Sequence, residues 1–339
     1  MITTRTFVLA LVLCAFLSST FTYVLVRSSD QAERNEPKAV AQKAVTNTNC
    51  KVEVLRLPNR DVNELTSPIL LTDLACSSEE YDSLRSSISD YLNAEKKAGV
   101  IQQASVYLKS MNSGRWFEIN GNAMYNPGSL MKIAILMAYL KESETRPELL
   151  NQEFLLTTKI SEEVPQIRTS PPLEAGKKYK VKQLLEEMII NSDNDATNLL
   201  NEHINERMFT QVMGDLGSRT PSITDPNFEM SVLEYNRYFR VLYNSSYLTE
   251  ENSNYALNLL SKTNYRGAIV KDIPTSIRVA HKFGERPYQY GFNFNEAGLF
   301  YVNGDPYLLV VMTRGTDHSK LPEIISTVSK KCYDFMTAS

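Results

Sequence analysis

The sequence predicts an α+β fold, in which an antiparallel sheet is flanked by N- and C-terminal helices and joined to a mostly helical lobe. Two hairpin patterns lie far apart in the chain, at 104–119 and 297–313. The stretch between them, roughly 145–265, has mostly helical patterns, and further helical patterns lie outside both hairpins. Strands from the two hairpins can therefore pair into one sheet, and a cleft between sheet and lobe is a natural place for a site.

The chain begins with an apolar stretch, Phe7 to Val26, that carries no charge over 20 residues. A helix of that length spans a bilayer. No clear cleavage site follows, so an uncleaved membrane anchor and a removed signal peptide both stay open. Either one predicts export, with the remaining chain on the extracytoplasmic side or secreted. We divide the chain into an anchor or signal peptide (1–27), a flexible polar linker (28–49) and one domain (50–339).

The first half of the domain contains one clear helix before the first hairpin. Its pattern begins with a capping box of Ser77 and Glu80 and ends at Gly99. The preceding stretch, 50–76, has no pattern that assigns it. After the hairpin, a helix is expected from Ser129 to about Lys141.

The second half returns from helices to strands. The stretch 181–190 is helical, and Ser231 with Glu234 forms another capping box. The stretch 276–283 has a strand-like pattern. The second hairpin turns at Asn303-Gly304, and a helix closes the chain.

Composition and charge exclude several classes of function. The 339 residues suffice for a sizeable core, and the net charge of −3 gives no reason to expect nucleic acid as a partner. The three histidines include no H-E-x-x-H motif, so we expect no metal and no cofactor. We expect a monomer.

The cysteines suggest one disulfide. Cys332 lies on an apolar stripe at helical spacing, which favours a buried thiol. Cys14 lies in the N-terminal apolar stretch. Cys50 and Cys76 remain, and they are a plausible pair in an oxidising compartment.

Ser129 and Lys132 stand three residues apart in "YNPGSLMK", at the start of an apolar helix. On a helix this spacing places both on one face. A serine in the first turn lies near free backbone N–H groups, and a lysine held in an apolar wall has a lowered pKa and, if neutral, accepts the serine proton. The spacing alone also fits a capping serine and a lysine whose stem lies along apolar surface.

Two further motifs follow in order. Ser192, Asp193 and Asn194 come directly after the helical stretch, and all three residue types also favour a helix N-cap. Lys282 and Gly284, in "AHKFGER", lie at the end of the expected strand. A glycine there lets a ligand approach the backbone closely.

Together the three motifs resemble the serine β-lactamase and penicillin-binding protein superfamily, which carries S-x-x-K, then S-x-N or S-D-N, then K-[TS]-G. The nearest resemblance is to class A β-lactamases, over roughly 78–337. It implies a β-lactamase/transpeptidase-like domain with the helical lobe inserted at about 125–265. It also implies β-lactams or D-Ala-D-Ala-type stem peptides of peptidoglycan as substrates.

The resemblance implies a role for each matching residue. Ser129 would be the nucleophile that forms an acyl-enzyme, and Lys132 would be its base or proton relay. Ser192 would pass a proton to the leaving nitrogen.

It also implies the groups that bind substrate. Asn194 would hold the substrate amide, and Lys282 would face the substrate carboxylate. The backbone N–H groups of Ser129 and of Glu285, the residue after Gly284, would form the oxyanion hole.

The sequence departs from the family pattern twice. It has no E-x-x-L-N between the second and third motifs, where the family places the glutamate that activates the deacylating water; Asp225 and Glu229 are the nearby carboxylates. Phe283 replaces the usual Thr or Ser, which removes a hydroxyl donor to the substrate carboxylate. These departures predict acylation without fast deacylation. They also keep open the alternative of a non-catalytic cell-wall-binding or scaffold protein that retains the fold.

Overall fold

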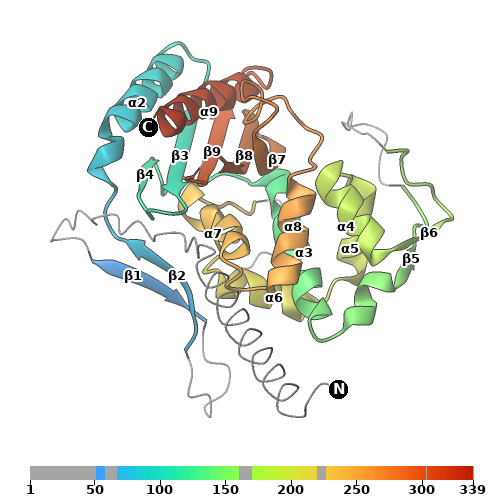
Figure 1. The fold of residues 1–339 in the computed structure, drawn as a ribbon. Helices are drawn as coiled ribbons and strands as arrows, with labels where there is room; N and C mark the ends of the chain where they lie inside the picture. Colours follow the sequence, from blue (N-terminus) through green and yellow to red (C-terminus); the bar gives the residue numbers. More distant parts are fainter. Residues whose placement is uncertain (1–50, 58–66, 160–169, 220–226, 303, 339) are drawn as a thin grey trace, which may run out of the picture. The chain divides into compact units, whose positions relative to one another are not determined.

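The computed structural model describes residues 51–57, 67–159, 170–219, 227–302 and 304–338 (Figure 1). The candidate anchor, the linker, Cys50 and Asp225 lie outside the described residues. Within the described ranges, no helix combines the length and the apolar character needed to cross a membrane.

One antiparallel sheet of five strands carries the domain, in the order β4-β3-β9-β8-β7 (Figure 1). Strand β3 pairs with β9, so the two hairpins join into one sheet as predicted. Strand β7 forms the free edge on the far side. The strands are β3 Gln103–Ser110, β4 Trp116–Ile119, β7 Arg278–Tyr288, β8 Gly291–Tyr301 and β9 Tyr307–Gly315.

Helices α2 (Asp82–Lys97) and α9 (Leu321–Thr337) lie side by side against one face of the sheet (Figure 1). Their apolar stripes form a single core with the side chains that β3 and β9 direct to this face. Cys332 is fully buried in that core, because it belongs to the stripe of α9. The expected layer of terminal helices is confirmed.

The other face of the sheet packs against the helical part of the chain (Figure 1). Helix α3 is its centre: Lys141 is the one residue of this helix that is not buried. The remaining helices surround α3, and a short two-stranded sheet lies beside them. The elements are α3 Lys132–Ser143, α4 Val181–Ile190, α5 Asn194–His203, α6 Glu206–Asp215, α7 Val232–Tyr243, α8 Glu250–Leu260, β5 Glu153–Leu155 and β6 Lys178–Lys180, with 3-10 turns η2 Gly128–Met131 and η3 Pro147–Asn151. A further 3-10 turn, η1 Glu79–Tyr81, leads into α2 on the first face.

One of the two predicted capping boxes is confirmed and the other is wrong. At α7, Glu234 N donates to Ser231 Oγ (3.2 Å), and Ser231 N donates to the Glu234 carboxylate (2.8 Å). At α2, the turn η1 precedes the helix, so Ser77 and Glu80 lie too early to cap it. Ser77 Oγ instead accepts a hydrogen bond from Arg85 (3.1 Å).

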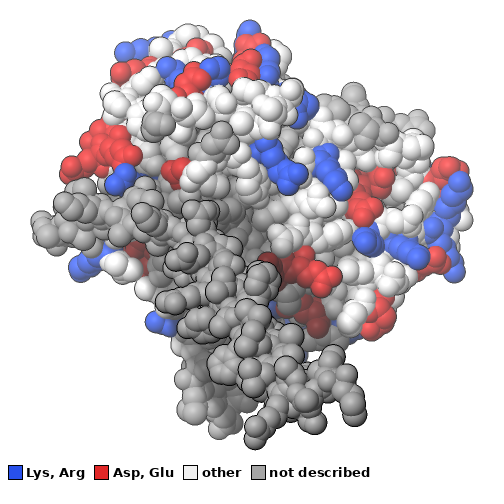
Figure 2. All heavy atoms as spheres, in the orientation of Figure 1, with Lys and Arg blue, Asp and Glu red and all other residues white. Residues whose placement is uncertain are grey.

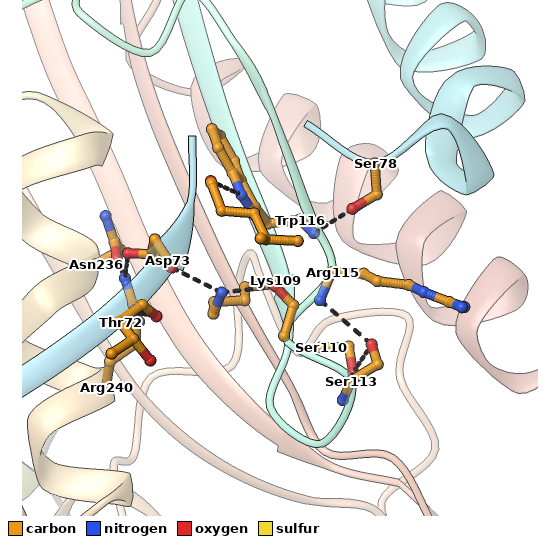
Figure 3. Close-up of polar contacts among 12 residues, drawn as sticks. Thr72, Asp73, Ser78, Lys109, Ser110, Ser113, Arg115, Trp116, Asn236 and Arg240 are labelled. Atoms are coloured by element: carbon orange, nitrogen blue, oxygen red, sulfur yellow. Dashed lines mark hydrogen bonds and ion pairs between the residues drawn. The ribbon is translucent and has the colours of Figure 1, made fainter. Parts of the chain in front are cut away.

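The stretch that the sequence left unassigned forms a hairpin of β1 (Val52–Arg56) and β2 (Ile69–Leu74). Asp73 attaches it to the rest of the domain (Figure 3). Its carboxylate accepts from Lys109 Nζ of β3 (2.8 Å) and from the guanidinium of Arg240 of α7 (2.6 Å). Because both cations are buried, this carboxylate is their main compensation for lost hydration.

The disulfide prediction is partly tested. Cys76 is disulfide-bonded, and Cys332 is a free, buried thiol. The partner of Cys76 lies outside the described residues, so the pairing with Cys50 stays a prediction.

Charged side chains are mixed on the face drawn in Figure 2. Lys and Arg lie among Asp and Glu there, and neither sign forms a continuous patch on the described surface in this view.

Candidate active site

Ser129 lies in the turn η2, which packs directly on the edge strand β7. Two glycines allow this approach. A methyl group on Gly284 would lie 2.6 Å from Leu130 N and 2.9 Å from Ser129 N, and one on Gly128 would lie 2.8 Å from the carbonyl carbon of Glu285. Gly128 also has φ +53, in the left-handed region that favours glycine. Any larger residue at either position would separate the serine from the strand.

The strand β7 directs a backbone N–H toward this serine. Residues of an antiparallel strand point their N–H and C=O to the same side, and the side alternates along the strand. The carbonyl of His281 accepts from Thr263 Oγ1 and that of Phe283 accepts from Lys282 Nζ, so both point away from β8. Glu285 is next in the alternation and therefore turns its N–H to the free edge, beside Ser129.

Lys132 is the first residue of α3, and its side chain is buried with 4% exposure. Its Nζ donates to the carbonyl of Ser192 (2.6 Å) and to Oδ1 of Asn194 (2.9 Å), and it lies 3.2 Å from Ser192 Oγ. Burial lowers the pKa of Lys132 to about 7, although the nearby Asp193 carboxylate opposes the shift. The amine therefore exists in both protonation states near neutral pH.

Ser192 lies between the helices α4 and α5, with φ +53. This backbone conformation is uncommon for serine, and the neighbouring N-cap fixes it: Asp193 Oδ1 accepts from Ala196 N (2.6 Å). The conformation places Ser192 Oγ 2.9 Å from Lys282 Nζ as well as 3.2 Å from Lys132 Nζ. The three predicted motifs therefore converge on one hydroxyl.

Lys282 is fully buried in β7, and its pKa is lowered well below the usual value. Burial is the main cause, the nearby Lys132 adds to it, and the carboxylates of Glu296 and Glu285 oppose it. The prediction that Lys282 lies at the end of its strand is wrong, since β7 continues to Tyr288. The strand extends because residues 283–288 all pair with β8.

The residues 83–336 match the family model described as beta-lactamase enzyme family. The chain belongs to this family. A comparison with curated proteins found no match to the chain. The shared fold and family support a serine β-lactamase-like hydrolase.

Solved structures share the fold at low sequence identity. PBP-A is 19% identical, with a TM-score of 0.64 over 76% of this chain and 97% of its own. A β-lactamase from Chitinophaga pinensis DSM 2588 is 17% identical, with a TM-score of 0.64 over 74% of this chain and 100% of its own. TLA-1 extended spectrum β-lactamase is 16% identical, with a TM-score of 0.65 over 76% and 99%.

The β-lactamase-family site includes one polar residue that sequence reasoning missed. Asn126 Oδ1 accepts from Gly128 N (3.1 Å), and its carbonyl accepts from Asn295 Nδ2 of β8 (2.9 Å). Asn126 thus holds the turn η2 to the sheet. The local signal was the Asn-Pro-Gly sequence, in which an Asn side chain bonds to the backbone two residues later.

Two features expected of the site are missing from the described residues: a hydrogen bond between Ser129 and Lys132, and an unpaired carboxylate at Glu229 that could hold a deacylating water. Within the described part of the chain, the hydroxyl of Ser129 has no hydrogen-bond partner, so the serine and Lys132 are neighbours without being bonded. Glu229 precedes α7 and forms an ion pair with Arg314 (2.8 Å). That pairing makes it a poor candidate for holding a deacylating water.

Proposed function

We propose that this member of the β-lactamase family is a serine hydrolase that forms an acyl-enzyme at Ser129, on β-lactams or D-Ala-D-Ala-type cell-wall peptides. One observation carries the proposal: Lys132 and Lys282 approach the same Ser192 hydroxyl, next to a serine packed on the edge of β7. A fold kept only as a scaffold has no need to bury two lysine amines at one hydroxyl.

Lys132 is suited to take the proton of Ser129. A neutral amine has two N–H donors and one lone pair. Three oxygens lie within hydrogen-bond distance of Lys132 Nζ: Ser192 O, Asn194 Oδ1 and Ser192 Oγ. A neutral amine donates to only two of them, so its lone pair is left to accept a hydroxyl proton. Ser129 Oγ then attacks the substrate carbonyl carbon, and the proton moves to Lys132.

Ser192 is suited to complete the proton transfer. When the carbon–nitrogen bond of the substrate breaks, Ser192 Oγ gives its proton to the leaving nitrogen and regains one from the Lys132 ammonium 3.2 Å away. Lys282 Nζ, on the other side, donates a hydrogen bond to Ser192 Oγ (2.9 Å) and so stabilises this oxygen after it has given up its proton. The acyl group then remains on Ser129.

The oxyanion of the intermediate would lie between the backbone N–H groups of Ser129 and Glu285. The close packing of Gly128 and Gly284 brings these two backbones together. Removing one such donor in a hydrolase typically slows turnover by about 10²–10³.

Deacylation is the slow step in this proposal. Glu229 is paired with Arg314, and no E-x-x-L-N motif supplies another carboxylate. A variant of PBP-A, which shares the fold, has been solved as an acyl-enzyme complex with penicillin-G.

We also propose that the domain acts outside the cytoplasm, attached to a membrane through 7–26 or secreted after cleavage. The uncharged N-terminal stretch and the disulfide at Cys76 support this location. Fractionation of expressing cells tests it: carbonate-resistant membrane association supports an anchor, and a mature N-terminus beyond Val26 supports secretion.

The full chain, purified in detergent, tests the chemistry. Incubation with a fluorescent penicillin should label the wild-type protein, and Lys132→Ala should slow labelling by about 10²–10⁴-fold. Lys141→Ala is a matched control, since Lys141 belongs to the same helix but pairs with Glu144. Equal labelling of both lysine variants would refute the role of Lys132.

A further inference from the structure

The contact between Ser192 and Lys282 joins two separate parts of the fold. Ser192 lies between α4 and α5 and Lys282 belongs to β7, yet Ser192 Oγ lies 2.9 Å from Lys282 Nζ. A proton donor has to lie within hydrogen-bond reach of the atom that it protonates. A side chain that fixes the spacing of these two parts therefore acts on the reaction without touching the substrate.

Thr263 lies against β7, directly beside the third motif. Its side chain is buried, and its Oγ1 donates to the carbonyl oxygen of His281 (2.9 Å), the residue before Lys282. This carbonyl points to the free edge of the strand, the same edge that carries the N–H of Glu285. Thr263 thus holds the edge of β7 just before the residues of the site.

Asn264, the next residue, lies against the end of α4. Its backbone N–H donates to the carbonyl of Ile190 (3.1 Å), and its Nδ2 donates to Oδ1 of Asn191 (2.6 Å). Asn191 directly precedes Ser192. Two consecutive residues therefore hold the chain immediately before each of the two groups that meet at the Ser192 hydroxyl.

Both attachment points are also fixed within their own parts of the fold. Asn191 Nδ2 donates to the carboxylate of Glu187 (2.7 Å) and to Ser170 Oγ (2.8 Å). His281 Nδ1 lies 2.7 Å from Oε1 of Glu296 on β8, and both of these side chains are buried. Since each part is held in this way, the two residues that bridge the gap set its width.

We infer that Thr263 and Asn264 are positioning residues. They set the distance between the hydroxyl of Ser192 and the amine of Lys282, and through it the transfer of a proton to the leaving nitrogen. This inference rests on the proposed function and adds to it two residues that lie outside the three motifs. Because they act through Ser192, their effect depends on whether the leaving group needs a proton.

Two acyl donors with different leaving groups test the inference on the full chain. The nitrogen of a fluorescent penicillin has to gain a proton as its bond to carbon breaks, whereas the p-nitrophenyl ester of an N-acylglycine releases a phenolate that leaves without one. Thr263→Val removes the hydroxyl and nearly keeps the shape of the side chain. It should slow acylation by the penicillin roughly tenfold or more and acylation by the ester far less. Equal slowing of both reactions, or of neither, overturns the inference.

Matched variants separate positioning from folding. Thr263→Ser keeps the hydroxyl and should keep the wild-type ratio of the two rates, and a ratio like that of Thr263→Val overturns the inference. Asn264→Ala should shift the ratio in the same direction as Thr263→Val, and it takes the place of that variant if the valine protein does not fold. Ser143→Ala removes another buried hydroxyl that donates to a backbone carbonyl, that of Leu140 (2.7 Å), and should leave the ratio unchanged.

A double-mutant cycle tests whether Thr263 acts through Ser192. In a Ser192→Ala protein, Thr263→Val should slow penicillin acylation much less than in the wild-type protein, because the hydroxyl that it positions is already gone. An undiminished effect in the Ser192→Ala protein overturns the inference.

The outcome for the proposed function is separate. If penicillin does not acylate the wild-type protein, the proposed function fails and this inference fails with it. If penicillin acylates Ser129 in the wild-type protein and Thr263→Val slows both acyl donors equally, only the inference on positioning fails.

Discussion

Replacing Gly284 by alanine tests how closely the serine must lie against β7. The added methyl group would lie 2.6 Å from Leu130 N and 2.9 Å from Ser129 N, and it would overlap the carbonyl oxygen of Pro127. Since ordinary contacts of a carbon atom are about 3.5–4.0 Å, the turn η2 has to move by roughly 1 Å. All three obstacles are backbone atoms, so no side chain can rotate to relieve the overlap.

A displacement of that size has two measurable effects. Acylation should fall by about 10²-fold, because a misplacement of about 1 Å at a reacting group has that effect. The free energy of unfolding should fall by about 1–3 kcal/mol, as in other overpacked sites. Fluorescent-penicillin labelling measures the first effect, and denaturant unfolding measures the second.

Two further glycine variants sharpen the test. Gly128→Ala approaches the same contact from the other side and should act in the same direction. Gly214→Ala, in helix α6, adds a methyl group with no heavy atom within 4 Å and should leave acylation unchanged. Wild-type acylation by a folded Gly284→Ala protein would refute the geometry of the site proposed above.

Three other predictions follow from the structure. Acylation should accelerate as the pH rises through about 7, because the lowered pKa of Lys132 makes its amine neutral above that value. The rate at pH 6 should be about tenfold below the plateau. A flat pH–rate profile would contradict the role of Lys132 as base. Asp73→Asn should lower the free energy of unfolding by about 1–3 kcal/mol, because it leaves Lys109 and Arg240 buried without a carboxylate. The control Asp82→Asn, which breaks an exposed ion pair, should change it by less than about 1 kcal/mol. Equal losses in denaturant unfolding would show that the Asp73 network adds no stability. Peptide mapping without reduction should find Cys76 linked to Cys50 and Cys332 alkylated slowly; a cross-linked peptide that contains Cys332 would contradict its burial.

The sheet and the two layers of helices were predictable, because the spacing of apolar residues and the residue types found in turns are local signals. Both hairpins, the stripe of α9 and the capping box at Ser231 follow from residues within a few positions of one another. The hairpin of β1 and β2 was not predictable in the same way. Its attachment depends on Asp73 meeting one cation from strand β3 and one from helix α7, both far away in the chain.

The candidate site was predictable in its residues but not in its geometry. The family resemblance gave the two lysines that meet at Ser192 Oγ and the asparagine that accepts from Lys132. It did not give the 3-10 turn around Ser129, which depends on two glycines far apart in the chain that fit one contact. Nor did it give the ring of Phe283 over Lys282, since a strand pattern does not tell how an edge side chain turns.

The most direct test of the account is the location of a penicillin adduct. The full chain is incubated with penicillin G, and intact mass followed by peptide mapping locates any covalent group. The account predicts one adduct per chain on Ser129 that persists for many minutes, and none in Ser129→Ala, while Ser113→Ala behaves like the wild-type protein. An adduct on another residue, or an unlabelled wild-type protein, would contradict it.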